Sequence, residues 1–275
     1  MKGSESMASI RGKYTIYIPG GNNTALVEGI GYTAEQRKLI NDRIMQDNPD
    51  IEQVGFVALD GEPELKMAGG EFCGNATRSA AHFYMHGNFG ELMVNINGKK
   101  VCAGVYKNGD AWCEIPLISD RANMLSQLDE GIYKVKMDGM VTIVILEEQS
   151  AQYLQNRDKL KEVTTQLIEK YGLKSAEAVG VMFLETVDGK LKINPVVWVN
   201  AIETLFNETA CGSGTTATAI VKSSLTGEDG SFEVLQPSGY TITAQVKYQN
   251  GVVDCVRISG VVETTGIKKE FEVLE

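Results

Sequence analysis

The sequence has no surplus of positive charge. Its 26 lysine and arginine residues are outnumbered by 36 aspartate and glutamate residues, which gives a formal net charge of −10 at pH 7. Proteins that bind nucleic acids or anionic bilayers gather basic side chains that neutralise phosphate groups. The charge balance therefore argues against nucleic acid as a partner and against attachment to an anionic membrane surface.

Long hydrophobic runs are also missing. Apolar stretches such as Met140 to Leu146 and Pro195 to Val199 predict buried strands, because they are far shorter than the roughly 20 residues that cross a bilayer. The N-terminal segment lacks the apolar core of a signal peptide. We therefore expect a cytoplasmic protein with no membrane partner, and the sequence leaves open whether the residues before Met7 are native.

Closely spaced cysteine pairs of the CxxC type are absent as well. The cysteines are odd in number, widely separated and without a CxxC spacing, which disfavours a disulfide framework. They are Cys73, Cys102, Cys113, Cys211 and Cys255. In a reducing compartment most thiols are small buried hydrophobic residues. Cys102, Cys113 and Cys255 fall in strand patterns, so we expect them to be core or edge residues.

Histidine is scarce. The chain has two, His82 and His86, at an i, i+4 spacing that can chelate a metal. No HExxH motif is present, and no third ligand follows with a convincing spacing. We therefore expect no metal site.

Short β-rich runs separated by turn dipeptides make up most of the chain. Asn-Gly and Asp-Gly pairs with β-branched or aromatic neighbours predict antiparallel hairpins. These pairs stand at 97–98, 108–109, 138–139, 188–189 and 250–251. Thr33, with Gln36 three residues later, forms a capping box ahead of a helix that runs to about Gln46. A second surface helix is expected over Asp158 to Tyr171, with Gly172 as its C-terminal cap.

Two further predicted helices, Asn75 to His86 and Ser213 to Leu225, are rich in Ala, Ser and Thr and carry few charges. This composition suits helices enclosed by sheet. Both begin with the pattern Cys-Gly-(Asn/Ser)-x-Thr, at Cys73 and at Cys211. A repeated element at nearly half the chain length indicates an ancient duplication with pseudo-twofold symmetry.

The length of 275 residues also suggests two domains. No Pro-rich or Ser-rich linker separates them, but the stretch 116–130, before strand signals resume at Ile132, is a reasonable connection. We predict an N-terminal domain over 1–125 and a C-terminal domain over 126–275, with the last strand able to return to the first domain.

The paired Cys-Gly elements carry the predicted chemistry. A helix N-terminus presents free backbone N–H groups and a partial positive charge, so it binds anions and lowers a thiol's pKa. Two such termini facing one cleft would hold an α-carboxylate and place a sulfur on each side of Cα. A thiolate on one face could then remove the α-proton while the opposite thiol delivers another. The pattern predicts an amino-acid racemase or epimerase in which Cys73 and Cys211 are catalytic.

The chain resembles the diaminopimelate epimerase superfamily over essentially its whole length. The CGN-type and ACGSG-type motifs of that superfamily match Phe72 to Asn75 and Ala210 to Gly214. The resemblance implies a mixed α/β (α+β) fold of two pseudo-symmetric domains, each a mostly antiparallel sheet wrapped round a central helix. It also implies a homodimer that needs neither pyridoxal phosphate nor metal.

The same resemblance implies a set of substrate-binding residues. Asn22 lies in the early Gly-Asn loop, Gln53 matches a glutamine of the family, and 236–239 match a late turn. Residues of the two motifs complete the set together with Glu203. The Glu203 side chain would either contact the substrate amine or project into water. The expected substrate-binding residues are Asn22, Gln53, Gly74, Asn75, Glu203, Gly212 and Ser213.

Departures from the epimerase pattern bear on the substrate. Diaminopimelate epimerases carry Glu-Arg before the second motif, where the arginine grips the distal carboxylate, whereas this chain has Glu203-Thr204. The segments 139–142 and 179–181 likewise replace asparagine-rich linings. The sequence around both motifs is most similar to cofactor-independent histidine racemases of the kind that feed metallophore synthesis. We therefore expect interconversion of L- and D-histidine.

Three alternatives remain open from the sequence. The chain could act on diaminopimelate, proline or another amino acid with the same architecture. Cys73 and Cys211 could form a thiol redox switch without turnover. The protein could also bind an amino acid without catalysis. Which cysteine acts on which enantiomer does not follow from two locally similar motifs.

Overall fold

The fold is mixed α+β and dominated by strands. The computed structural model describes residues 9–274, so the question about the residues before Met7 lies outside the described part. The described strands are β1 Ser9–Pro19, β2 Thr24–Glu28, β3 Gln53–Val57, β4 Glu64–Met67, β5 Gly90–Ile96, β6 Lys99–Val105, β7 Ala111–Glu114, β8 Leu125–Asp129, β9 Ile132–Met137, β10 Met140–Ile145, β11 Ala178–Val187, β12 Lys190–Val199, β13 Thr204–Asn207, β14 Gly230–Leu235, β15 Thr241–Gln249, β16 Val252–Gly260 and β17 Val262–Leu274. The described helices are α1 Ala34–Asp47, α2 Gly74–Met85, α3 Glu147–Leu154, α4 Leu160–Lys170 and α5 Gly212–Thr226, with 3₁₀ turns η1 Arg121–Asn123 and η2 Arg157–Lys159.

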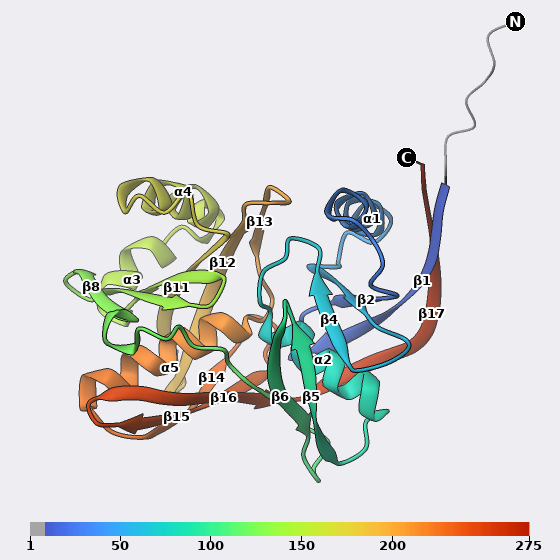
Figure 1. Cartoon of the computed structure of the whole chain (residues 1–275). Helices are drawn as coiled ribbons and strands as arrows, with labels where there is room; N and C mark the ends of the chain where they lie inside the picture. Colours follow the sequence, from blue (N-terminus) through green and yellow to red (C-terminus); the bar gives the residue numbers. More distant parts are fainter. Residues whose placement is uncertain (1–8, 275) are drawn as a thin grey trace, which may run out of the picture.

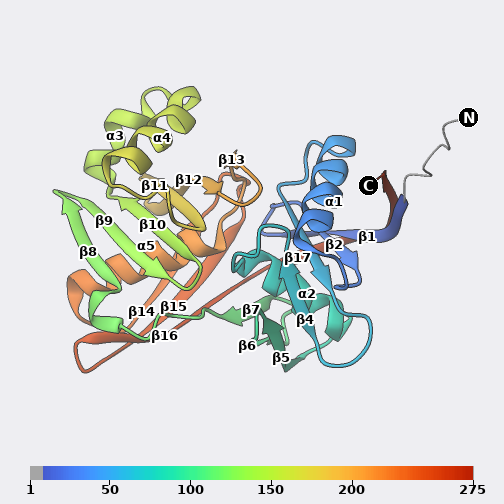
Figure 2. The same cartoon turned by 45° about the horizontal axis from the view of Figure 1, so that its top comes forward.

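Two helices organise the molecule. Strands β1 to β7 contact α2, and strands β9 to β12 together with β14 to β16 contact α5. Figures 1 and 2 show these two groups side by side, with α1 on the outside of the first and α3 and α4 on the outside of the second. The first eight residues of α2 are all buried, as are most of α5. Small side chains make this possible because they let strands approach a helix closely on several sides.

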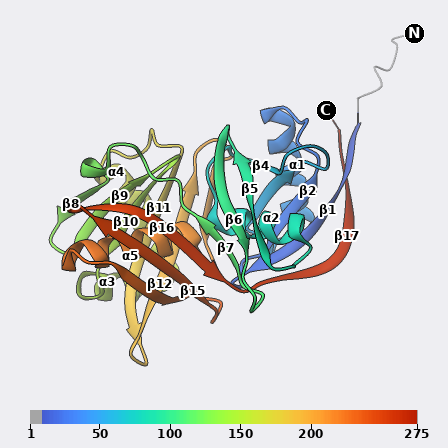
Figure 3. The same ribbon diagram turned by 60° about the horizontal axis from the view of Figure 1, so that its bottom comes forward.

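The C-terminal strands join the two groups. β16 pairs antiparallel with β7, and β17 continues along β1 from Ser9 to Pro19. Figure 3 shows this red segment running from the strands around α5 to the far edge of the strands around α2. The described strands therefore form one hydrogen-bonded sheet network.

The local predictions from turns and caps are confirmed. Each of the five Asx-Gly pairs connects antiparallel strands: β5 to β6, β6 to β7, β9 to β10, β11 to β12, and β15 to β16. At the first of these, Asn97 and Gly98 have φ of 53° and 81°, the left-handed pair that a type I′ hairpin turn requires. The capping box of Thr33 and Gln36 is also present.

Three expectations about secondary structure were wrong in part. Helix α3 was not predicted because its eight residues have no side-chain cap. In the fold, an ion pair of Lys222 with Glu147 ties this helix to α5. The helix expected from Asp158 begins as the 3₁₀ turn η2, so the α-helix starts at Leu160. Strand β8 lies inside the expected connection 116–130. It was missed because its sequence LSQLD is too polar to give a strand signal.

No helix among residues 9–274 is both long enough and apolar enough to cross a membrane.

Candidate active site

The two motif cysteines occupy equivalent positions at helix N-termini. Cys73 is the N-cap of α2 and Cys211 is the N-cap of α5, with φ and ψ of −129° and 114° in the first and −131° and 107° in the second. Each sulfur accepts a hydrogen bond from the backbone N–H three residues later, at 3.3 Å from Ala76 N and 3.3 Å from Gly214 N. The thiols therefore sit where the helix N–H groups converge, as the sequence predicts.

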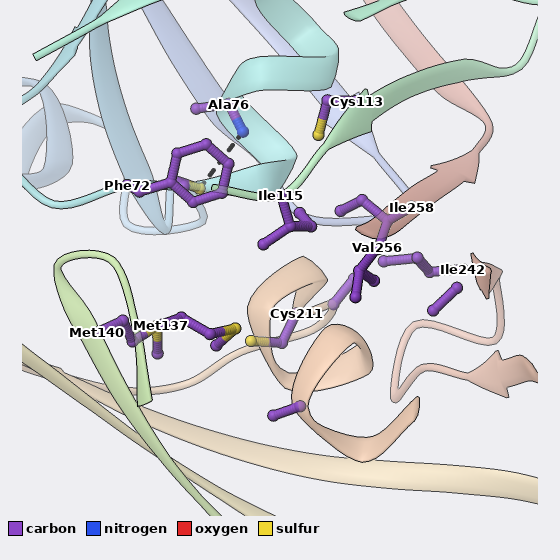
Figure 4. Packing of buried hydrophobic residues seen from close by; sticks show 14 of the residues in the cluster. Phe72, Ala76, Cys113, Ile115, Met137, Met140, Cys211, Ile242, Val256 and Ile258 are labelled. Atoms are coloured by element: carbon purple, nitrogen blue, oxygen red, sulfur yellow. Dashed lines mark hydrogen bonds between the residues drawn. The ribbon is translucent and has the colours of Figure 1, made fainter. Parts of the chain in front are cut away.

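The two helix N-termini lie against each other. Asn75 Nδ2 donates to the Ala210 carbonyl at 2.8 Å, which ties α2 to the residue before Cys211. A Cβ on Gly212 would lie 2.8 Å from Ile258 Cδ1, and one on Gly74 would lie 2.7 Å from the same atom. Figure 4 shows Ile258 and Ile115 between the two ends, and its dashed line marks the bond from Ala76 to the Cys73 sulfur. A side chain at either position would force Ile258 to shift.

Polar side chains connect the two thiols. The Cys73 thiol donates to Gln53 Oε1 at 2.9 Å, and Gln53 Nε2 donates to Glu208 Oε1 at 2.9 Å. A hydrogen bond and the charge of Glu208 both act on the pKa of the Cys211 thiol. Ser213 Oγ lies 3.3 Å from the Cys211 sulfur. The hydrogen bonds of Gln53 and Glu208 thus lead from Cys73 towards Cys211.

A cavity opens beside this bridge. It is lined by Asn41, Glu52, Gln53, Val54, Ala68, Glu71, Phe72, Cys73, Met140, Ala178, Val197, Val199, Ile202, Thr204, Phe206, Glu208 and Ser213. Three of the lining residues are glutamates, and none is lysine or arginine. Its volume of about 40 Å³ holds only a few water molecules, since one water needs roughly 10–15 Å³. An amino acid therefore requires the lining side chains to move apart.

Burial controls the charges of the site. It raises the pKa of both Cys73 and Cys211 well above the ordinary thiol value, and neighbouring glutamates add to the effect. Burial also raises the pKa of Glu208 to about 8 and that of Glu71 to about 7. The expected lowering of the thiol pKa is wrong for this closed state. The helix N–H groups do favour the thiolate, but desolvation outweighs them.

The structure brings some predicted substrate residues to the cavity and leaves others outside. Gln53 and Ser213 line it, whereas Gly74, Asn75 and Gly212 form the junction of the two helix ends.

Asn22 and Glu203 lie apart from that lining. Asn22 is fully buried, with its amide donating to Glu52 Oε2 at 2.7 Å and accepting from Thr24 Oγ1 at 2.9 Å. It therefore reaches the site through Glu52. Glu203 is exposed in the turn after β12, with φ of 55°, and does not line the cavity.

The carboxylates of the site were not among the residues predicted from the sequence. Glu71 stands two residues before Cys73, and Glu208 stands three residues before Cys211. Both precede the repeated pattern by two or three residues, so an acidic residue ahead of each cysteine was the signal that could have revealed them. Both have a buried Oε2 atom without a hydrogen-bond partner. Such atoms are suited to receiving a donor from a substrate.

The remaining predicted residues have structural surroundings. Cys102, Cys113 and Cys255 lie in β6, β7 and β16. His82 packs edge-on against Tyr17 with ring centroids 5.8 Å apart, and His86 is the left-handed C-cap of α2. In the described part of the chain, no group of three or more His, Cys, Asp or Glu side chains is arranged to hold a metal ion.

Comparisons with known proteins show what this chain is similar to. The family model described as the histidine racemase CntK N-terminal domain matches residues 13–269. A histidine racemase of Fusobacterium nucleatum is 28% identical over 249 residues, which are 86% of this chain and 92% of that protein. A histidine racemase of Staphylococcus aureus is 24% identical over 262 residues, which are 87% of this chain and 92% of that protein.

Solved structures share the fold at low sequence identity. A hydroxyproline epimerase of Agrobacterium vitis superposes with a TM-score of 0.59 at 13% identity, covering 96% of this chain and 92% of that one. A phenazine biosynthesis protein of the PhzF family from Bacillus anthracis superposes with a TM-score of 0.59 at 16% identity, covering 98% of this chain and 100% of that one. These neighbours show the fold alone.

Proposed function

The chain belongs to the family of the histidine racemase CntK N-terminal domain and is an isomerase; from that premise we propose that it interconverts L- and D-histidine without pyridoxal phosphate. Cys73 and Cys211 are the two bases. The observation that carries this proposal is the pair of thiols at facing helix N-termini, bridged by Gln53 and Glu208. Such an arrangement supports proton transfer on opposite faces of one Cα.

The reaction needs one base and one acid at a time. One thiolate takes the α-proton, so that the Cα–H bond breaks, an S–H bond forms and the electron pair passes into the carboxylate as an enediolate. The opposite thiol then protonates Cα from the other face and becomes the thiolate. The N–H groups at the starts of α2 and α5 stabilise the growing charge on the carboxylate oxygens. After one turnover the thiol and the thiolate have exchanged places between the two cysteines, and the reverse reaction restores the original protonation states.

The substrate itself helps to form the thiolate. In the closed site, burial holds both thiols protonated at neutral pH. An α-ammonium group beside Glu208 brings a positive charge, and an opposite charge within about 4–6 Å favours the ionised form of a group. We expect the thiolate to form once the amino acid is bound, which protects the free enzyme from alkylation and oxidation.

The cavity favours a basic side chain over an acidic one. Glu52 and Glu71 line it together with Asn41, while Phe72 and Phe206 supply aromatic surface. A second carboxylate, as in diaminopimelate, would find no lysine or arginine in the lining to pair with it. An imidazole offers ring N–H donors to these carboxyl groups and a flat apolar face to the phenylalanines. Histidine therefore fits the lining better than diaminopimelate does.

Several expectations remain proposals. They are the division at residues 125 and 126 into two pseudo-symmetric domains, membership of the wider diaminopimelate epimerase superfamily, a homodimer and a cytoplasmic location. The homodimer follows from the superfamily resemblance alone. Sedimentation of the purified protein at several concentrations tests it directly.

The activity is tested in deuterated water under reductant without added cofactor. L-Histidine should acquire deuterium at Cα and form D-histidine, as read by chiral chromatography and mass spectrometry. A panel of the other amino acids and diaminopimelate gives the specificity. Tight histidine binding without deuterium exchange would identify a binding protein instead, and absence of both would refute the proposal.

A further inference from the structure

Two consecutive residues at the start of β3 hold two consecutive residues ahead of Cys211. The Glu52 carboxylate accepts from Thr209, and Gln53 Nε2 donates to Glu208 Oε1 at 2.9 Å. Strand β3 belongs to the group around α2, whereas residues 208 and 209 link β13 to α5. These contacts therefore join the two parts of the molecule at the segment that leads into the second thiol.

The Glu52 carboxylate receives donors at both of its oxygens. Thr209 N donates to Oε2 at 3.0 Å, and Asn22 Nδ2 donates to the same oxygen at 2.7 Å. The Thr209 hydroxyl has one proton and two acceptors within reach, Glu52 Oε1 at 2.5 Å and the Gly21 carbonyl at 3.0 Å. The nearer, charged acceptor takes that proton. An ionised carboxylate accepts at both oxygens and presents no donor, whereas a glutamine would turn an NH₂ group towards one of these donors.

Buried residues behind Glu52 fix its position. Asn22 and Thr24 are both fully buried. Thr24 Oγ1 donates to Asn22 Oδ1 at 2.9 Å, which directs the amide N–H groups of Asn22 towards Glu52. The place of the carboxylate is thus set from within the group around α2, and Thr209 is held against it. Asn22, which the sequence assigns to substrate binding, supports this contact from behind.

The same two residues of β3 are tied to the first thiol. The Cys73 thiol donates to Gln53 Oε1 at 2.9 Å. On its other side, the Thr209 carbonyl accepts from Ser238 N at 2.9 Å, in the turn between β14 and β15. Thr209 stands two residues before Cys211. A shift of Thr209 would therefore be passed on to the second thiol, while the first thiol stays with Gln53.

We propose that Glu52 is a positioning residue that, by holding Thr209, fixes the place of Cys211 in the site. This rests on the proposed function, because the spacing of the thiols matters only if both act on one Cα. Proton transfer needs the reacting atoms in near-attack geometry, and a misplacement of about 1 Å costs on the order of 100-fold in rate. Thr209 is not among the residues that line the cavity, so its hydroxyl acts on the reaction through position.

The test separates the hydroxyl of Thr209 from its volume. Thr209→Val removes the donor and keeps the shape, Thr209→Ser keeps the donor, and Glu52→Gln replaces the acceptor. The double variant Glu52→Gln/Thr209→Val completes a double-mutant cycle. Thr165→Val on α4 is the matched control, because Thr165 is exposed like Thr209 and its hydroxyl donates only within its own helix, at 3.1 Å from Lys161 O. Thermal unfolding establishes which variants are folded.

Thr209→Val should lower kcat for histidine racemisation by about tenfold or more and change KM much less, whereas Thr209→Ser should stay within about threefold of the wild type. Glu52→Gln should lower kcat at least as much as Thr209→Val. The double variant should be no slower than Glu52→Gln alone, because both changes break one contact. Without substrate, hydrogen–deuterium exchange of residues 208–214, read by mass spectrometry, should be faster in Thr209→Val, because a released segment opens more often. Thr165→Val should change none of these quantities.

A folded Thr209→Val variant with wild-type kcat overturns the proposal, and so do losses that multiply in the double variant. Equal losses in the valine and serine variants have the same meaning, because the hydroxyl would then not be the cause. If Glu52→Gln does not fold, the two Thr209 variants decide alone. A wild-type protein that does not racemise histidine refutes the proposed function instead. Exchange of residues 208–214 still tests the contact in that case, so the two failures are distinguishable.

Discussion

Replacing Glu208 with glutamine should make the protein more stable at alkaline pH. The carboxyl is almost completely buried and its pKa is raised to about 8 by desolvation and by the charge of Glu52. Between its ordinary value of 4.5 and about 8, the folded protein holds a proton that the unfolded chain has lost. The free energy of unfolding therefore falls as pH rises through this range.

The magnitude follows from the size of the pKa change. A rise from 4.5 to about 8 costs the folded state about 5 kcal/mol above the upper pKa, at roughly 1.36 kcal/mol for each pKa unit. This value is an upper bound, because Glu52 and Glu71 share the same site and their side chains rearrange when the charge of Glu208 is removed. Glutamine keeps an oxygen that accepts from Gln53 and carries no charge at any pH.

Urea unfolding near pH 5 and near pH 9 measures the difference. The two proteins should be close in stability at the lower pH, and Glu208→Gln should gain a few kcal/mol over the wild type at the higher pH. Glu203→Gln, in the exposed turn after β12, is the control that should show no such change. A difference between Glu208→Gln and wild type that is equal at both pH values would refute the assignment of Glu208 as a buried, protonated group.

Further predictions concern the catalytic thiols, the helix junction, a cap and metal dependence. Cys73→Ser and Cys211→Ser should each abolish racemisation measured by chiral chromatography, because a hydroxyl is a far weaker base than a thiolate; wild-type rates would reduce the cysteine to a packing role. Gly212→Ala should destabilise the fold by about 1–3 kcal/mol in urea unfolding, because the new methyl would meet Ile258 Cδ1 at 2.8 Å, and an unchanged midpoint would contradict the tight junction. Thr33→Ala should cost about 1 kcal/mol in the same assay through loss of the α1 cap. Chelators should leave activity intact, and a loss that zinc restores would point to a metal site.

Features that depend on a few neighbouring residues could be predicted from the sequence. The turn at Asn97 and Gly98 and the cap of Thr33 follow from backbone preferences within four residues. The placement of Cys73 and Cys211 at helix N-termini is equally local, because the small residues after each cysteine favour a buried helix.

Features that depend on distant residues could not be predicted in this way. Gln53 and Glu208 are 155 positions apart, and their hydrogen bond exists only because the fold brings the two motif regions together. The raised thiol pKa has the same origin, since burial is a property of the assembled core. Glu203 was favoured by a motif alignment, but the turn after β12 directs it to solvent and leaves Glu208 at the cavity.

The pairing of β17 with β1 has a consequence for biosynthesis. The first strand emerges from the ribosome long before residues 262–274 exist, so its edge waits without a partner until they are made. Contacts of such large sequence separation form slowly, and an unpaired strand edge invites association with other chains. Synthesis of residues 262–274 therefore closes an edge at which an incomplete chain is open to association with others.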